Sequence, residues 1–287
     1  MKRIVWTGLL TLTLATTAWA GDSALDPVVA ALEAGKYDQV VELASAIDAK
    51  SPERARADYL IGEAELVRGN HAEAEAAFLN VLRANKDAVP ALIGLGITLS
   101  HKGQSENAVK AFDRAAELAP KDFLVERARG EHHLRHDELK KAASAFSAAS
   151  KLAPNDAQTC RGWVEALLRS DQQKSAKKQA KRFLKKNPEH PMGHFLAGLV
   201  ADRMGDDDEA IEAYEQAIAL DDAFLDAHKN LAIVCTARNA LYQDWDRTKK
   251  ALRHYERYFE LGGKDEELRQ VYQTIDRVLS EVIDRQE

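Results

Sequence analysis

A pattern of glycine, alanine and aromatic residues recurs along this chain at intervals of 34 residues. Its clearest copy covers residues 89–122, in which Gly96, Ala108 and Phe112 hold fixed places. Three columns keep this register over most of the sequence: Gly62, Gly96, Gly130 and Gly198; Ala74, Ala108, Ala142, Ala176 and Ala210; and Phe78, Phe112, Phe146 and Tyr214. A chain with such a repeat folds as a row of similar units that pack on their neighbours, and not around one central core.

Each copy of the pattern predicts two helices joined by a short turn. In the clearest copy, apolar residues three or four positions apart predict one helix over about 91–102 and a second over about 105–118. Gly103 between them suits the positive φ that a helix C-terminus often needs. In two later copies Asp137 and Asp171 stand where this turn glycine is expected.

These columns resemble the tetratricopeptide repeat family, whose helix–turn–helix unit of 34 residues has small and aromatic residues at such places. The resemblance covers about residues 21–262 and implies an all-α fold, a right-handed α-solenoid of about seven repeats with a C-terminal capping helix. The units are expected near residues 21–54, 55–88, 89–122, 123–156, 157–190, 191–224 and 225–263, followed by the cap in residues 264–287.

The seventh unit has an insertion of seven residues at the turn between its helices, because its alanine is Ala251. Such an insertion is absorbed by about one additional turn on each helix, which leaves every face pointing as before. We therefore expect the hairpin to protrude, with Tyr242 and Trp245 near its tip. Exposed, these two aromatic residues are a candidate second interaction surface; the alternative is that they pack against the last helix.

The last predicted helix covers about residues 265–285 and has one apolar stripe. The stripe consists of Leu268, Val271, Ile275, Val278 and Val282. A stripe of this kind suits a helix that covers the end of the repeat array and presents its polar side to solvent. The alternative is that the stripe pairs two copies of the chain in a homodimer.

The N-terminal residues 1–20 have the pattern of a secretory signal peptide. Lys2 and Arg3 precede an apolar run that ends in Ala18-Trp19-Ala20. We expect cleavage after Ala20 and a periplasmic or secreted protein without a transmembrane segment in the mature chain. The alternative, a membrane anchor, is disfavoured because the run is shorter than the about 20 residues of a membrane span.

Charge and cysteine content exclude some partners and bonds. The net charge of −6 makes nucleic acid an unfavourable partner, and export makes it more so. Cys160 and Cys235 fall in the first helices of the fifth and seventh units, with a whole hairpin between them. Because a disulfide needs Cα atoms within about 7 Å, we expect two buried free thiols.

No motif in the sequence indicates catalysis. A Gly-rich phosphate loop, a nucleophile elbow and a Cys-x-x-Cys pair are all missing. His132 and His136 are four residues apart, as two helical metal ligands would be, but no third ligand is evident and His133 falls in a packing column. The expectation is a protein that is not an enzyme and has no cofactor and no metal.

In the family that the chain resembles, the first helices of the units line a concave groove that holds a segment of a partner. Carried onto this sequence, the groove comprises Tyr59, Ile93, Ile97, Arg127, Glu131, Arg135, Arg161, Glu165, Arg169, Phe195, Leu199 and Arg203. One interpretation is that Arg135, Arg169 and Arg203 hold carboxylates of the partner while the apolar residues anchor its side chains. The other is that arginines and glutamates four residues apart satisfy each other on a solvated helix.

The strongest run of charge is the basic stretch 174–186, which falls on the second helix of the fifth unit. One interpretation makes it a site for an anionic polymer or membrane surface. The other pairs it with the second helix of the next unit. In that interpretation, Lys174, Lys178 and Lys181 stand in the columns of Asp208, Glu212 and Glu215.

These observations favour a non-enzymatic periplasmic scaffold that holds a protein partner of unknown identity in its concave groove. The resemblance implies a role in the assembly of an envelope, pilus, secretion or polysaccharide machine. The alternative function is binding of an anionic polymer or membrane surface through the basic helix 174–186.

Overall fold

The computed structural model of this chain describes residues 24–236 and 245–284 and is all-α over these residues. The helices are α1 Asp26–Glu33, α2 Tyr37–Ser45, α3 Arg54–Arg68, α4 His71–Ala84, α5 Val89–His101, α6 Ser105–Leu118, α7 Phe123–Arg135, α8 Leu139–Leu152, α9 Ala157–Arg169, α10 Gln173–Lys186, α11 Pro191–Met204, α12 Asp207–Leu220, α13 Leu225–Thr236, α14 Trp245–Glu260 and α15 Glu266–Asp284. The predicted all-α helical-repeat fold is confirmed.

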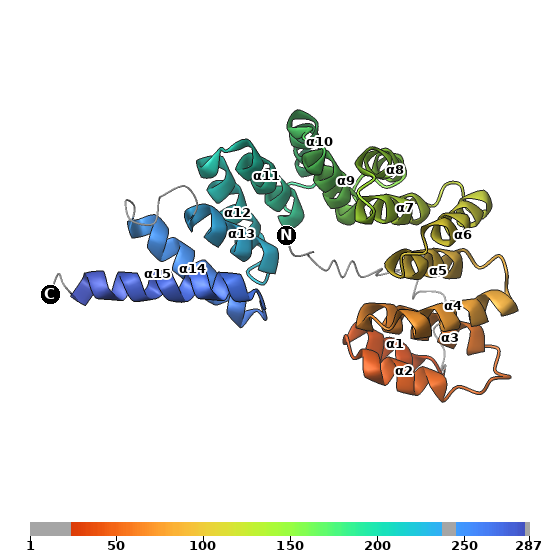
Figure 1. The fold of residues 1–287 in the computed structure, drawn as a ribbon. Helices are drawn as coiled ribbons and strands as arrows, with labels where there is room; N and C mark the ends of the chain where they lie inside the picture. The colour runs from red at the N-terminus through yellow and green to blue at the C-terminus, as the bar shows by residue number, and fades with distance from the viewer. Residues whose placement is uncertain (1–23, 237–244, 285–287) are drawn as a thin grey trace. The chain divides into compact units, whose positions relative to one another are not determined.

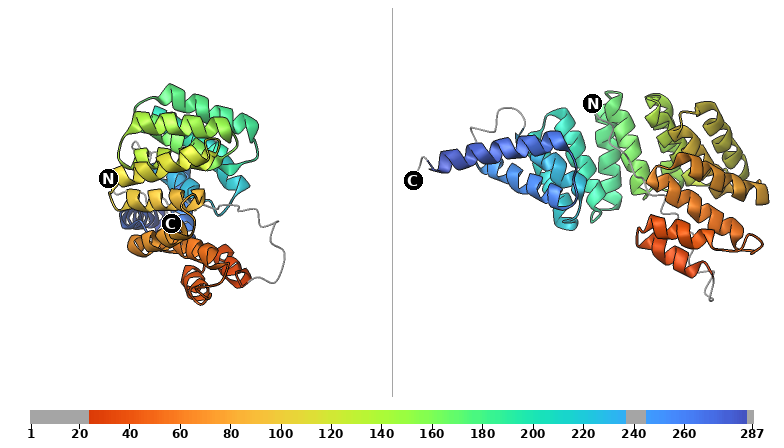
Figure 2. Two further views of the ribbon diagram at one scale, coloured as in Figure 1. Left: turned by 90° about the vertical axis from the view of Figure 1, so that its right-hand side faces the viewer. Right: turned by 60° about the horizontal axis from the view of Figure 1, so that its bottom comes forward.

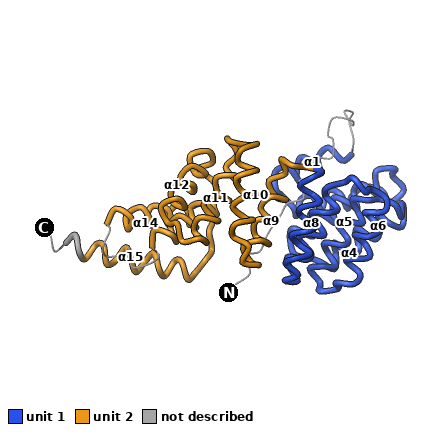
Figure 3. Tube along the Cα trace, turned by 90° about the horizontal axis from the view of Figure 1, so that it is seen from above, with its two compact units in different colours: residues 1–152 blue, residues 153–287 orange. Residues whose placement is uncertain are grey.

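Consecutive helices pair as hairpins, from α1 with α2 to α13 with α14 (Figure 1). We call the odd-numbered member of each pair a first helix and the even-numbered member a second helix. The chain divides into two compact units, residues 1–152 (unit 1) and 153–287 (unit 2), which are coloured separately in Figure 3. Within each unit a first helix contacts the next first helix, as α3 contacts α5 and α9 contacts α11, and the layering is visible in the further views of Figure 2.

The glycine and aromatic columns of the sequence meet inside the hairpins. The contacts are between Gly62 and Phe78, Gly96 and Phe112, Gly130 and Phe146, and Gly198 and Tyr214. A Cβ atom added at Gly96 would lie 2.5 Å from a ring carbon of Phe112, which is closer than such atoms approach. Because Phe112 is 1% exposed, the ring has no free space to move into. The aromatic ring of the second helix therefore fills the space that a side chain at the glycine of the first helix would occupy.

The turn between the two helices of a hairpin requires a residue with positive φ. Gly103 has a φ of +75°, and Asp137 and Asp171 adopt φ values of 60° and 58° at the corresponding turns. Aspartate tolerates this conformation better than most residues. The backbone thus keeps the turn where the sequence has lost the glycine.

The seventh hairpin agrees with the expected insertion as far as it is described. Ala251 is fully buried, as predicted for its column, and α14 begins six residues before it at Trp245. In α6 the corresponding distance is three residues, from Ser105 to Ala108. The second helix is therefore longer by about one turn. The expected additional turn of the first helix and the residue Tyr242 lie outside the described residues. Trp245 is described and is half-buried.

The C-terminal helix α15 packs on α14. The rings of Phe259 and Tyr272 have centroids 6.0 Å apart, and the Arg269 guanidinium lies 4.3 Å from the Phe259 centroid. Ile275 is buried, while the apolar residues around it on α15 are half-buried as far as they are described. Cys160 and Cys235 are buried free thiols, as predicted. Among the described residues, no helix has the length and apolar content to cross a bilayer.

The contact between Gly96 and Phe112 predicts that Gly96→Ala destabilises the protein. Helix propensity alone would stabilise this variant by about 1 kcal/mol, whereas overpacking costs about 1–3 kcal/mol, so we expect a net loss in the free energy of unfolding. Urea unfolding followed by circular dichroism measures it. In Phe112→Leu, with a smaller partner side chain, adding Gly96→Ala should cost less than it does in the wild type. A Gly96→Ala variant as stable as the wild type would contradict the packing argument.

Candidate functional site

In unit 1 the predicted surface begins with Tyr59 on α3, and Glu63 follows it one helical turn later. Tyr59 is buried, its ring lies edge-on to Phe78 with centroids 5.8 Å apart, and its hydroxyl donates a hydrogen bond to Glu63 Oε1 at 2.6 Å. Burial raises the pKa of the Glu63 carboxyl to about 7, although the hydrogen bond from Tyr59 lowers it. Near neutral pH this carboxyl is therefore divided between its neutral and ionised forms.

The apolar residues predicted as anchors differ in exposure within each pair. Ile93 is 1% exposed and Phe195 is 3% exposed, so both belong to the core of their units. Ile97 and Leu199, one helical turn later, are half-buried. Only the second member of each pair presents enough surface to contact a partner.

The central arginine of unit 1 is turned into the protein. Arg127 is 8% exposed, its guanidinium lies 5.7 Å from the centroid of the Phe123 ring, and its Nε is 3.8 Å from Glu131 Oε1. This agrees with the interpretation in which arginine and glutamate four residues apart satisfy each other. Arg127 therefore contributes to packing more than to an open charged surface.

The central arginine of unit 2 is also engaged. Arg161 on α9 reaches over α11 and donates a hydrogen bond to Asp226 Oδ2 on α13 at 2.7 Å. Its guanidinium lies 5.6 Å from the centroid of the Phe195 ring, and the tilted rings of Phe195 and Phe224 have centroids 4.9 Å apart. These contacts join three successive first helices into one face. Asp226 was not predicted, because it stands 65 residues from Arg161 and outside the repeat columns.

The arginines at the C-terminal ends of the first helices are exposed. In unit 1, Arg135 donates a hydrogen bond to His101 Nε2 at 2.9 Å. In unit 2, a guanidinium nitrogen of Arg169 is 3.5 Å from Glu165 Oε1, which is a weak contact on an exposed side chain. Arg203 forms no ion pair with any described residue. These arginines are therefore more exposed than Arg127 and Arg161, whose side chains are held against their units.

The histidine pair considered for metal binding has another role. Both ring nitrogens of His132 contact serine hydroxyls, Nδ1 with Ser100 at 2.8 Å and Nε2 with Ser105 at 3.1 Å. Burial, with smaller contributions from nearby histidines, lowers the pKa of His132 to about 4. His133 falls in a column whose neighbouring members Leu99 and Leu167 are buried, but His133 itself is half-buried, whereas His132 is buried. No group of three or more metal-ligating side chains occurs among the described residues.

The helices α10 and α12 are joined by an ion pair between Lys177 and Glu209 at 2.8 Å, but the expected set of pairs between them is wrong. It would have joined Lys174, Lys178 and Lys181 to Asp208, Glu212 and Glu215. Asp208 is paired instead with Arg247 on α14, and Glu215 with Lys250 on α14 at 2.6 Å. The second helix of the seventh hairpin, and not that of the fifth, thus neutralises these acids.

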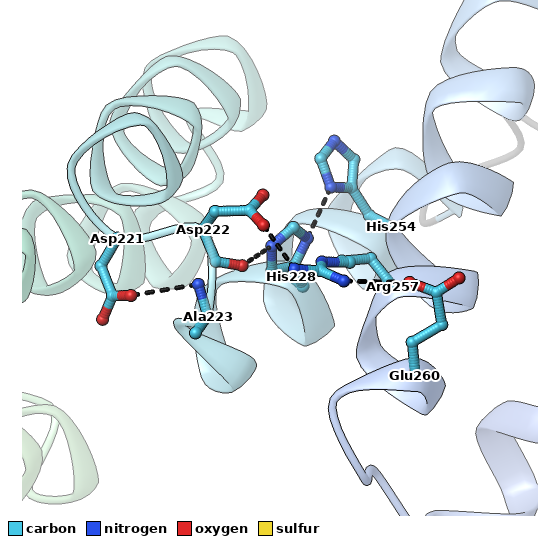
Figure 4. A network of polar contacts seen from close by, with 7 residues as sticks. All are labelled: Asp221, Asp222, Ala223, His228, His254, Arg257 and Glu260. Atoms are coloured by element: carbon cyan, nitrogen blue, oxygen red, sulfur yellow. Dashed lines mark hydrogen bonds and ion pairs between the residues drawn. The ribbon is translucent and has the colours of Figure 1, made fainter.

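A polar network joins the turn before α13 to α14 (Figure 4). His228 donates from Nε2 to the carbonyl oxygen of Asp222 at 3.0 Å, so its Nδ1 accepts from His254 Nδ1 at 2.9 Å. Arg257 bridges Asp222 and Glu260. Burial lowers the pKa of both imidazoles, that of His254 to about 4. The network fixes α14 against α13 and offers no open ligand position on His228.

Comparison with known proteins agrees with the repeat pattern. The sequence profile described as tetratricopeptide repeat matches residues 28–90, 93–157 and 162–241. No curated protein sequence matches the chain. Among solved structures, a tetratricopeptide repeat protein from Parabacteroides merdae is similar with a TM-score of 0.65 and 11% identity, over 88% of this chain and 97% of the other.

Two further solved structures are similar. PilF of Pseudomonas aeruginosa has a TM-score of 0.56 and 14% identity, over 78% of this chain and 96% of the other. A chain of the APC/C hetero-tetramer Cut9–Hcn1 has a TM-score of 0.61 and 16% identity, over 86% of this chain but only 48% of the other. This chain therefore spans about half the length of that one, and likenesses at such identities show the fold alone.

The raised pKa of Glu63 predicts a pH-dependent effect of Glu63→Gln. Between the ordinary pKa of 4.5 and the folded value of about 7, the folded state keeps a proton that the unfolded chain has lost, so stability falls as pH rises. At about pH 8 we expect Glu63→Gln to stabilise the protein by on the order of 2 kcal/mol, and at about pH 5 by less than half of that. Urea unfolding at the two pH values measures the difference.

The matched control for this prediction is Glu73→Gln, which replaces an exposed carboxylate on α4. It should change stability little and equally at both pH values. An effect of Glu63→Gln that does not depend on pH would show that the Glu63 carboxyl is ionised throughout.

Proposed function

This chain belongs to the tetratricopeptide repeat family, and from that premise we propose that it is a non-enzymatic scaffold that holds a segment of a protein partner on the first-helix face of its repeats. Members of this family are generally protein-binding scaffolds, and stacked repeats create extended binding surfaces. We further propose that the protein works in the periplasm, in assembly of an envelope, pilus, secretion or polysaccharide machine.

The observation that carries the proposal is the contrast between inner and outer arginines in unit 2. Arg161 is committed to Asp226 and Phe195 and forms the floor of the face formed by α9, α11 and α13. Arg169 and Arg203, at the ends of α9 and α11, are exposed, and Arg169 lies 3.5 Å from Glu165 Oε1. Guanidinium groups recognise carboxylates with paired hydrogen bonds, so these two residues suit an acidic group of the partner.

Apolar contact on the same face is available at Leu199. It is half-buried on α11, one turn before Arg203, and so presents part of its side chain beside the exposed guanidinium. A partner segment with a carboxylate next to an apolar side chain fits this combination. In unit 1, the residue one turn after the half-buried Ile97 is His101, which accepts a hydrogen bond from the exposed Arg135 of α7.

We predict that Arg169→Glu with Arg203→Glu abolishes capture of the partner. A photo-crosslinking residue at position 199 should join the wild-type protein to a partner in native envelopes, and the double reversal should reduce the crosslinked product about tenfold or more. The control is Lys140→Glu with Lys151→Glu, which makes the same charge change on the exposed side of α8. A product that survives the Arg169/Arg203 reversal at full yield would refute the proposed role of these arginines.

The proposed location has its own test. If residues 1–20 are a signal peptide, the protein isolated from cells should begin at Gly21 and appear in the periplasmic fraction or the medium. Intact mass measurement and cell fractionation decide this. Ala18→Lys, which places a large charged residue in the cleavage site, should yield the uncleaved form, and retention of residues 1–20 by the wild type would contradict the proposal.

A further inference from the structure

The second helix α10 has an unusual distribution of charge. It contains seven basic residues and no acidic one. Its core side is formed by Ala176, Ala180 and Phe183, which are all buried. The exposed residues Lys174, Lys178, Lys181 and Lys185 follow one another at steps of four, three and four, and so lie on one side of the helix, opposite the core. We call these four residues the lysine ridge.

The ridge has no neutralising partner within the described residues. The ion pair that α10 forms there is between Lys177, beside the ridge, and Glu209 of α12 at 2.8 Å. The acids Asp208 and Glu215 of α12 are taken by α14. Like charges four residues apart repel each other on a helix, and a lysine in the first turn opposes the helix dipole. The ridge therefore reduces the stability of α10 and gains nothing from neighbouring helices.

The width of the ridge restricts what can cover it. The neighbouring helix α12 carries five acidic residues and no basic one over Asp207–Leu220. A flat anionic membrane surface would cover both helices but would meet basic residues on only one of them, since α12 has none and its Asp208, Glu209 and Glu215 are already paired. A partner one helix wide, lying along α10, meets only the basic charge.

The side-chain chemistry restricts the partner further. The one aromatic residue of α10 is Phe183, which is 3% exposed, so the ridge offers no ring on which bases could stack. Six of the seven basic residues are lysines, which act as point charges, so the ridge attracts anionic groups through its charge and spacing and not through bidentate hydrogen bonds. From these observations we propose that the lysine ridge docks an acidic segment of a protein, whose carboxylates follow α10 at helical spacing.

This surface is separate from the first-helix face, because the ridge lies on a second helix and points away from the core of its own hairpin. A partner could contact both surfaces, but each has its own residues and its own variants. The failure of one proposal therefore leaves the other intact.

The test measures binding of a fluorescent peptide of about 20 residues, with glutamates at steps of four and three, by anisotropy at low and high salt. A second peptide with glutamine in place of glutamate is its control. The variant reverses the ridge: Lys174→Glu, Lys178→Glu, Lys181→Glu and Lys185→Glu. The matched variant reverses four other exposed lysines that form no ion pair with described residues: Lys36→Glu, Lys86→Glu, Lys110→Glu and Lys121→Glu.

We expect the glutamate peptide to bind the wild type and the glutamine peptide not to bind. Reversal of the ridge should weaken binding about 30-fold or more at low salt, and the matched reversal less than about threefold. If the reversed ridge unfolds α10, seen as a loss of helical circular dichroism, the same four positions changed to glutamine should still weaken binding about tenfold.

Three results would overturn the proposal. The first is that the glutamate peptide does not bind the wild type. The second is that the ridge reversal and the matched reversal weaken binding equally, which would show that binding depends on net charge alone. The third is tighter, ridge-dependent binding to vesicles of anionic phospholipid or to polyphosphate than to the peptide, which would assign the ridge to a membrane or to an anionic polymer.

Discussion

The contact between a glycine of the first helix and an aromatic ring of the second helix, which occurs in four hairpins, is the interaction on which the rest of this structure depends. At Gly96 the absence of a Cβ atom leaves the space that Phe112 occupies, and the same contact occurs between Gly198 and Tyr214 in the other unit. Because the ring is buried against the glycine, it restricts the rotation at which the two helices can pack. That rotation decides which residues of each helix face the core and which face solvent.

Once the rotation is fixed, the repeat presents the same positions of every first helix on one face. The central position of that face is used for cohesion: Arg161 crosses Phe195 to reach Asp226, and Arg127 lies over Phe123. The position near the helix end is exposed, with Arg135 in contact with His101 and Arg169 in contact with Glu165. A family fold that generally binds proteins thus separates the residues that hold the repeats together from those that are available to a partner.

The charged residues of the second helices are arranged differently from those of the first helices, because the second helices contact each other through long side chains. Between α12 and α14 the charges are complementary and closely paired, as in Glu215 with Lys250. The lysines of α10 have no such complement among the described residues apart from the pair of Lys177 with Glu209. Since exposed pairs contribute only about 0–1 kcal/mol each, the fold tolerates both arrangements, and the difference between them concerns recognition more than stability.

The sequence by itself determined the helical hairpins, their turns, the buried columns and the free buried cysteines, because each depends on local periodicity or on a residue that the repeat requires. Even the aspartates at the turns could be placed, since Asp137 and Asp171 occupy positions where the backbone demands positive φ. The 34-residue register also identified the first-helix positions as candidates for a site.

Only the tertiary structure decided which candidate side chains are buried or paired with another residue of the protein. Arg161 finds its partner 65 residues away, Asp208 pairs with α14 and not with α10, and His132 and not His133 is buried. Such choices depend on the reach of long side chains and on small rotations between helices. A repeat pattern fixes the columns but does not fix which neighbouring column supplies the opposite charge.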